Sequence, residues 1–278
     1  MRLAISNIAW DVAEDESIAS LLQRFGVDAI DIAPGKYFPE PATATDEDMA
    51  RVKRWWVDRG LEITGMQALF FGTTGLNVFG SPDVQEAMLL HLTHVCRIGA
   101  GTGAKRLVFG APRNRDRTGL SDQQTMDIAL AFFRRLGDIA QSFGVLICLE
   151  PNPTCYGANY MTTSAETLRI VEQLAHPSIK MQLDTGALAI NGEDVAAVLQ
   201  DCAPFIGHIH ASEPDLLPLG DGGARHPIFA EAIKIYLPNH LVTIEMLATK
   251  NEPHTISVER ALIVAKQYYC HDKIGASA

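Results

Sequence analysis

Four side chains of metal-binding type stand at or near the ends of apolar runs in the second half of the chain: Glu150, Asp184, His210 and Glu245. Short apolar runs bounded by turn residues read as buried strands. Burying an unpaired carboxylate costs several kcal/mol, so an acid at the end of such a strand predicts a positive charge beside it. A divalent cation shared by all four side chains would supply that charge.

Three carboxylates and one imidazole form a hard, oxygen-rich ligand set. Such a set suits Mn²⁺, Mg²⁺ or Co²⁺ better than a structural zinc ion, and we expect Mn²⁺. The alternative for any one of these residues alone is a strand-end side chain that backbone amides and loop partners cap. Four of them at equivalent strand ends favour the metal site.

The seventh apolar run, FIGHIH (205–210), holds another histidine, His208, two residues before His210. We expect one of the two imidazoles to point into the barrel and the other to point outward or toward a loop. His210 is nearer the strand end and is the predicted ligand. His208 is interpreted as a core histidine, with a supporting role behind the ligand as the alternative.

Eight strand-like runs alternate with segments of helical spacing, and this alternation requires a parallel sheet covered by helices. The runs span residues 3–8, 29–33, 61–69, 106–110, 145–150, 179–184, 205–210 and 241–246. Eight such units predict an α/β fold, a single (β/α)8 barrel domain over 1–278, whose carboxyl strand ends surround one site. The alternative is a doubly wound open sheet, which the lack of a G-x-G-x-x-G motif after the first run disfavours.

Charge and cysteine usage restrict the partners and the compartment. With 23 basic and 33 acidic residues the formal charge is −10, which argues against nucleic acid and against an anionic membrane surface. No apolar run approaches the ~20 residues of a membrane helix, and the first residues lack a signal-peptide core. The five widely spaced cysteines form no C-x-x-C motif, so we expect a reducing, cytoplasmic location.

The ligand set resembles that of the xylose-isomerase-like barrel superfamily, in particular its ketose 3-epimerases. The intervals are 34 residues from Glu150 to Asp184, 26 from there to His210, and 35 from His210 to Glu245. They are similar to the family's spacing. The segments FGAPRNR (109–115) and HIHASEPDLLPLGDGG (208–223) look like the family's strand-four and strand-seven loops.

The resemblance implies a metal-dependent isomerase or epimerase that acts on a sugar or sugar derivative. Proton abstraction next to a carbonyl would proceed through a metal-stabilised cis-enediolate. It also implies that Glu150 and Glu245 are both ligands and acid/base catalysts. Related barrels form homo-oligomers, so we expect a dimer or tetramer that binds a small carbohydrate.

The sequence departs from the ketose 3-epimerases at three substrate contacts. Ala187 stands where they have a histidine, Leu216 stands where they have an arginine, and the loop after Glu150 lacks their second glutamate. These departures predict a different substrate within the same chemistry. Arg225 is a candidate replacement for the missing arginine.

Further residues could contact substrate. Arg113 and Arg115 follow the fourth run and could bind a phosphate or carboxylate, or else form surface salt bridges. Asn152 could orient a hydroxyl or build the proline turn. The candidate substrate-binding residues are Asn152, Arg113, Glu213, Arg225 and Trp10, the last as an apolar wall.

Three other functions are alternatives to epimerisation. A lyase or dehydratase acting on a keto-polyol or sugar acid would begin with the same proton abstraction and then expel water. An abasic-site endonuclease is disfavoured, because the net charge of −10 opposes binding to DNA and strands two to four lack the extra histidines of such enzymes. A non-enzymatic binding subunit is disfavoured by the complete ligand set.

Overall fold

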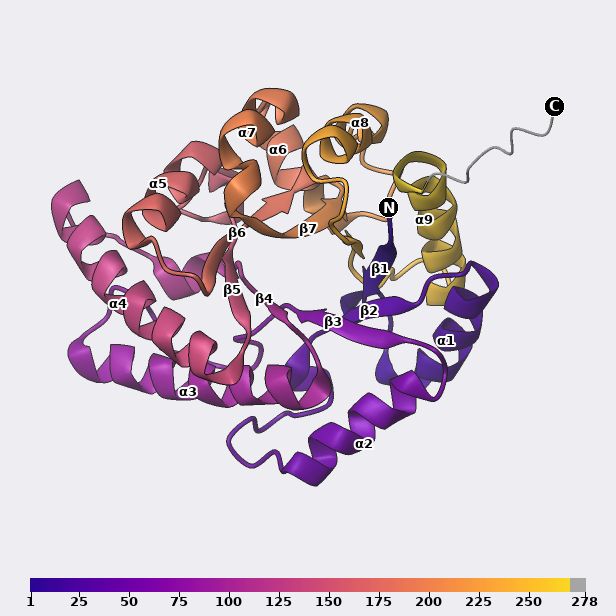
Figure 1. The fold of residues 1–278 in the computed structure, drawn as a ribbon, viewed down its shortest axis with the longest axis horizontal. Coiled ribbons are helices and arrows are strands. Elements are labelled where there is room, and N and C mark those ends of the chain that lie inside the picture. Colours follow the sequence, from indigo (N-terminus) through magenta and orange to yellow (C-terminus); the bar gives the residue numbers. More distant parts are fainter. Residues whose placement is uncertain (271–278) are drawn as a thin grey trace.

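Eight parallel strands close into a barrel in sequence order, with β1 hydrogen-bonded to β8 (Figure 1). The computed structural model describes residues 1–270. The strands are β1 (Leu3–Ser6), β2 (Ala29–Ile32), β3 (Glu62–Met66), β4 (Arg106–Phe109), β5 (Leu146–Leu149), β6 (Ile179–Asp184), β7 (Ile206–Ser212) and β8 (Val242–Glu245). All eight predicted runs form strands, and the predicted (β/α)8 barrel is confirmed.

Helices form a ring outside the strands (Figure 1). They are α1 (Asp15–Arg24), α2 (Asp46–Val57), α3 (Pro82–Thr102), α4 (Asp122–Phe143), α5 (Ser164–Leu174), α6 (Thr185–Asn191), α7 (Val195–Cys202), α8 (His226–Tyr236) and α9 (His254–Tyr269). Within residues 1–270, no helix combines the length and the apolar character that crossing a membrane requires.

Local sequence signals fix where the helices begin and end. Thr45 forms a capping box with Asp48 at the start of α2, and Ser121 does the same with Gln124 at the start of α4. At its carboxyl end α3 is capped by Gly103 in the left-handed conformation. These signals set the helix boundaries independently of the barrel.

The strand register places the predicted ligands in neighbouring positions. Asp184 on β6 pairs with His210 on β7, and Ser212 on β7 pairs with Glu245 on β8. Carboxyl ends of parallel strands meet at one rim of the barrel. The ligands of the second half therefore meet at that rim.

Short 3₁₀ turns lie in the connections between strands and helices. They are η1 (Asn7–Ala9), η2 (Val12–Glu14), η3 (Pro34–Lys36), η4 (Pro112–Arg115), η5 (Thr154–Tyr156), η6 (Ala203–Phe205) and η7 (Pro214–Leu216). Among them, η1, η3, η4, η5 and η7 follow carboxyl ends of strands and contribute residues to cavities at that rim.

Candidate metal centre and active site

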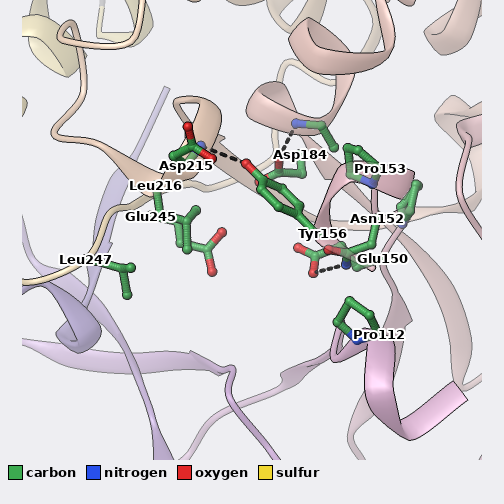
Figure 2. A pocket seen from close by; sticks show the side chains of 12 residues that line it. Pro112, Glu150, Asn152, Pro153, Tyr156, Asp184, Asp215, Leu216, Glu245 and Leu247 are labelled. Carbon is green, nitrogen blue, oxygen red and sulfur yellow. Dashed lines mark hydrogen bonds between the residues drawn. The ribbon is translucent and has the colours of Figure 1, made fainter. Parts of the chain in front are cut away.

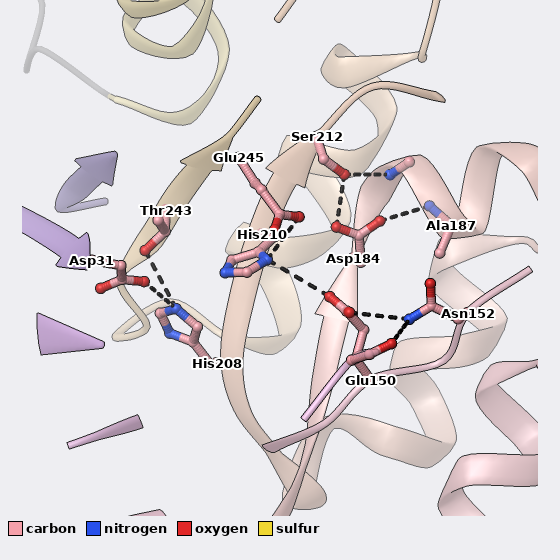
Figure 3. A network of polar contacts seen from close by, with 12 residues as sticks. Asp31, Glu150, Asn152, Asp184, Ala187, His208, His210, Ser212, Thr243 and Glu245 are labelled. Atoms are coloured by element: carbon pink, nitrogen blue, oxygen red, sulfur yellow. Dashed lines mark hydrogen bonds and ion pairs between the residues drawn. The ribbon is translucent and has the colours of Figure 1, made fainter. Parts of the chain in front are cut away.

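The four predicted ligands come together at the barrel rim (Figure 3). Each offers one ligand atom, and these four atoms all lie within 4.8 Å of one another. His210 Nδ1 lies 3.0 Å from Glu245 Oε2 and 3.7 Å from Glu150 Oε1. The spacing is short enough for one ion to contact all four side chains.

Hydrogen bonds from α6 and from the end of β7 hold Asp184 in place. The backbone amide of Ala187 donates to Asp184 Oδ1 at 2.7 Å, and the Ser212 hydroxyl donates to Oδ2 at 2.7 Å. The same Ser212 oxygen accepts from the Gly186 amide at 2.9 Å. This carboxylate therefore has a fixed orientation before any ion binds.

Glu150 is held from the side of β4. Asn152 Nδ2 donates to Glu150 Oε2 at 3.1 Å and to the carbonyl oxygen of Gly110 at 2.7 Å. Asn152 was a candidate substrate contact, and here its amide orients the catalytic candidate Glu150. Its side chain also lines a cavity, so the substrate role stays a prediction.

The electrostatics of the cluster fit a bound cation. Burial raises the pKa of Glu150, and the charges of Glu245 and Asp184 raise it further. Burial and the Glu245 charge also raise the pKa of Asp184. Burial opposes protonation of His210, yet the surrounding carboxylates outweigh it and raise its pKa to about 10. Within residues 1–270 no lysine or arginine forms a salt bridge with these three acids, so a divalent cation matches both the donors and the unbalanced charge.

Arg115 lies behind Glu150 and is fully buried. Its Nη1 donates to the Glu150 carbonyl at 2.7 Å, and its Nη2 donates to the Gly110 carbonyl at 3.3 Å. The guanidinium therefore joins the ends of β4 and β5, and Arg115 lines neither of the cavities at this rim. Both sequence alternatives for Arg115, an anion contact and a surface salt bridge, were wrong. Arg113 is exposed and does not line either rim cavity.

The prediction that only one of the two histidines points inward was wrong. Side chains two residues apart on a strand share a face, and both imidazoles lie inside the barrel (Figure 3). His208 Nε2 lies 2.6 Å from Asp31 Oδ2, and the Thr64 hydroxyl donates to Asp31 Oδ1 at 2.9 Å. The ring centroids of His208 and His210 are 5.1 Å apart, so the Asp31–His208 pair packs directly beneath the His210 ring.

Two cavities open beside the ligand cluster, and Glu150 and Glu245 line both of them. The first, of about 390 Å³, is lined by prolines, Asn152, Tyr156, Asp184 and Asp215 (Figure 2). The second, of about 430 Å³, extends toward β1–β4. The cavities also share Leu216 and Leu247, so substrate in either one would reach the two glutamates.

Three candidate substrate contacts lie away from these cavities. Trp10 is fully buried, and its Nε1 donates to Asp15 Oδ1 at 2.7 Å, so it is a core residue and not an exposed wall. Glu213 is also buried, and its carboxylate accepts from backbone amides and faces His226 at 2.9 Å. Arg225 lines a separate surface cavity between α7 and α8. The substrate roles predicted for these three residues are therefore corrected.

Several residues that line the second cavity were not among the predicted substrate contacts. Lys36, at the end of η3, and Leu247, in the loop after β8, line the second cavity. Gln67, directly after β3, also lines it. Its position one residue beyond a buried strand was the available signal, because carboxyl strand ends of a barrel face the site.

Comparisons with known proteins agree with this architecture. The ketose 3-epimerase of Arthrobacter globiformis is 27% identical over 99 residues, which are 36% of this chain and 34% of that protein. The D-psicose 3-epimerase of Ruminiclostridium cellulolyticum is 28% identical over 81 residues, or 29% and 27% of the two chains. The matched segments thus span about a third or less of these curated relatives.

The crystal structure of D-psicose 3-epimerase with D-tagatose from Clostridium cellulolyticum H10 superposes with a TM-score of 0.80. It covers 97% of this chain and 99% of that one at 18% identity, a likeness that shows the fold. A family model described as a xylose isomerase-like TIM barrel matches residues 19–265. The predicted family is confirmed: the chain belongs to the xylose isomerase-like TIM barrel family.

Proposed function

We propose that the protein is a divalent-metal-dependent epimerase or isomerase of a sugar or sugar derivative. The observation that carries the proposal is the position of Glu150 and Glu245. Both carboxylates belong to the four-residue ligand cluster, and both line the two cavities that a substrate would enter. Two acids at a shared cavity wall can act on opposite sides of one carbon.

The proposed chemistry is the exchange of a proton beside a carbonyl. One of the two glutamates removes the proton from the carbon, and the other returns a proton to the opposite face, so the configuration inverts and no atom is lost. A bound divalent cation, for which Mn²⁺ is our proposal, supplies the Lewis acid that stabilises the negative charge on the substrate oxygens. Asn152 holds the Glu150 carboxylate, and the Ser212 hydroxyl and Ala187 amide hold Asp184.

The curated relatives are named for epimerisation of ketoses, which supports the reaction class. Leu216 and Ala187 line the first cavity at the positions where the family resemblance implied an arginine and a histidine. We therefore propose that the substrate differs from a free ketose.

Solvent exchange tests the function. The Mn²⁺-loaded protein is incubated in D₂O with a panel of ketoses, ketose phosphates and keto-acids, and NMR monitors deuterium at the carbon next to the carbonyl. Incorporation together with appearance of the epimer or isomer supports the proposal. Loss of water with a new enone absorbance would indicate a dehydratase instead, and no incorporation with any sugar would contradict the assignment.

A further inference from the structure

The second cavity extends the site on the side of β1–β4. Glu150 and Glu245 form part of its wall, and its volume of about 430 Å³ exceeds the 390 Å³ of the first cavity. Each cavity falls within the size range of sites for drug-sized ligands. Together they offer more room than one small sugar held at the ligand cluster would need.

The walls of this second cavity are mainly apolar. Leu69, Phe70, Phe71 and Val108 line it, and Phe71 is 74% exposed at the rim. A sugar hydroxyl placed against these side chains would lose its hydrogen bonds to water without replacement, which is unfavourable. An aryl or alkyl group placed there would instead gain from leaving water.

The one cationic side chain among the described lining residues is already engaged. Lys36 Nζ donates to the carbonyl oxygens of Asn7 and Trp10. The carboxylates of Asp11 and Asp15 also act on this ammonium group electrostatically. The cavity wall therefore presents little net positive charge to an anionic group.

Gln67 is the polar exception. It is 3% exposed, and neither its Nε2 nor its Oε1 has a hydrogen-bond partner among the described residues. A buried polar group without a partner costs about 1–3 kcal/mol. Its position in the cavity wall indicates that a ligand supplies the missing partner.

We propose that the second cavity binds an apolar substituent of the sugar substrate, joined through an oxygen atom that Gln67 hydrogen-bonds. The substrate class is then an O-substituted sugar that keeps its carbonyl, such as an aryl or alkyl ether. This inference rests on the proposed function, because it assumes that the sugar carbonyl lies at Glu150 and Glu245.

The first test compares probes that differ only in the substituent. Calorimetry measures the affinity of the Mn²⁺-loaded protein for D-fructose, 1-O-benzyl-D-fructose and 6-O-benzyl-D-fructose. Burying a benzyl group predicts that at least one ether binds roughly tenfold or more tightly than D-fructose. The proposal is overturned if neither ether binds more tightly than D-fructose.

Two variants locate the substituent. Gln67→Met keeps the side-chain volume and removes the amide, so the preferred ether should bind about tenfold more weakly. Its melting temperature should stay unchanged or rise, because an unpaired buried amide has been replaced by an apolar group. A Gln67 with a structural role would give the opposite result, a lower melting temperature with unchanged ether binding.

Ala111→Phe fills part of the second cavity. The ratio of ether affinity to D-fructose affinity should fall toward one in this variant, whereas an unchanged ratio would place the benzyl group elsewhere and contradict the proposal. A benzyl preference that depends on these residues, without proton exchange on any sugar, would retain the cavity assignment and reject the proposed function. Proton exchange on D-fructose without any benzyl preference would retain the proposed function and reject the cavity assignment.

Discussion

Glu150 Oε2 occupies the space beside Gly110 that any side chain at that position would need. A Cβ atom built on Gly110 would lie 1.9 Å from this oxygen, well inside contact distance. The carboxylate of Glu150 is therefore held between the ends of β4 and β5 because residue 110 has no side chain.

This contact predicts the effect of Gly110→Ala. The methyl group should displace the Glu150 carboxylate, and a misplacement of about 1 Å can lower a rate about a hundredfold. Solvent-deuterium exchange on the active sugar measures the loss, and the melting temperature reports whether the fold persists. Full exchange in a folded Gly110→Ala protein would show that the position of this carboxylate does not matter.

Arg115 gives a second prediction, because it joins the same two strand ends. Arg115→Met leaves the Glu150 carbonyl oxygen without its donor and removes one of the two donors to the Gly110 carbonyl oxygen. It should lower the free energy of unfolding by about 1–3 kcal/mol. Arg115→Lys keeps the charge but not the planar fork, so it should restore part of the loss. Urea denaturation measures the free energy of unfolding of both variants. Equal values for Arg115→Met and wild type would contradict the inference that Arg115 holds the two strand ends together.

Removal of metal gives a third prediction. An ion that binds only the folded chain stabilises it, by about 2.7 kcal/mol at a hundred times its dissociation constant. Mn²⁺ should therefore raise the free energy of unfolding of wild type, and Asp184→Asn should lose most of that increase. Asp215→Asn, the same change at the cavity mouth but outside the ligand cluster, is the matched control. An equal Mn²⁺ effect in Asp184→Asn would exclude Asp184 as a ligand.

The strand ends were predictable because the signals were local and strong. An apolar run that ends on an acid or a histidine indicates both a buried strand and the end of that strand at which the polar side chain lies. This was enough to predict that Glu150, Asp184, His210 and Glu245 meet at one rim. The inward position of His208 follows from the two-residue period of a strand, because side chains two positions apart point to the same face. The expectation that His208 and His210 point in different directions did not follow this period. The partner of His208, Asp31, lies 177 positions away, so no local pattern indicated it.

Loop residues were harder to predict because their environment depends on contacts distant in sequence. Arg115 and Arg113 stand two positions apart in η4, yet the first is fully buried and the second is exposed. Trp10 follows a barrel strand as a substrate wall would, but its indole bonds to Asp15 within the core. In such segments the type of residue indicates possible chemistry without indicating the direction of its side chain.

The pair His254 and Glu14 predicts how stability depends on pH. The Glu14 hydrogen bond raises the pKa of His254 above its ordinary 6.5. Burial raises the pKa of Glu14, but the bond to His254 outweighs it and leaves that pKa below 4.5. The histidine contribution is complete below pH 6.5 and is lost as pH rises through the folded pKa, whereas the glutamate contribution is complete above pH 4.5 and is lost as pH falls.

The pair should therefore stabilise the fold most between pH 4.5 and 6.5. His254→Gln should lower the melting temperature in that window and have a smaller effect at pH 9. Thermal unfolding of both proteins across pH 4–9 checks this. A difference that grows toward high pH would have the wrong sign for the raised pKa.

Epimer interconversion by Glu150→Gln and Glu245→Gln, at Mn²⁺ concentrations that saturate each variant, tests the central claim most directly. NMR follows both epimers of the sugar that wild type converts, and calorimetry confirms that each variant still binds the ion. Removal of either acid/base group should slow interconversion about a thousandfold. Interconversion at the wild-type rate in either folded, metal-loaded variant would contradict the assignment of these two glutamates as the catalytic pair.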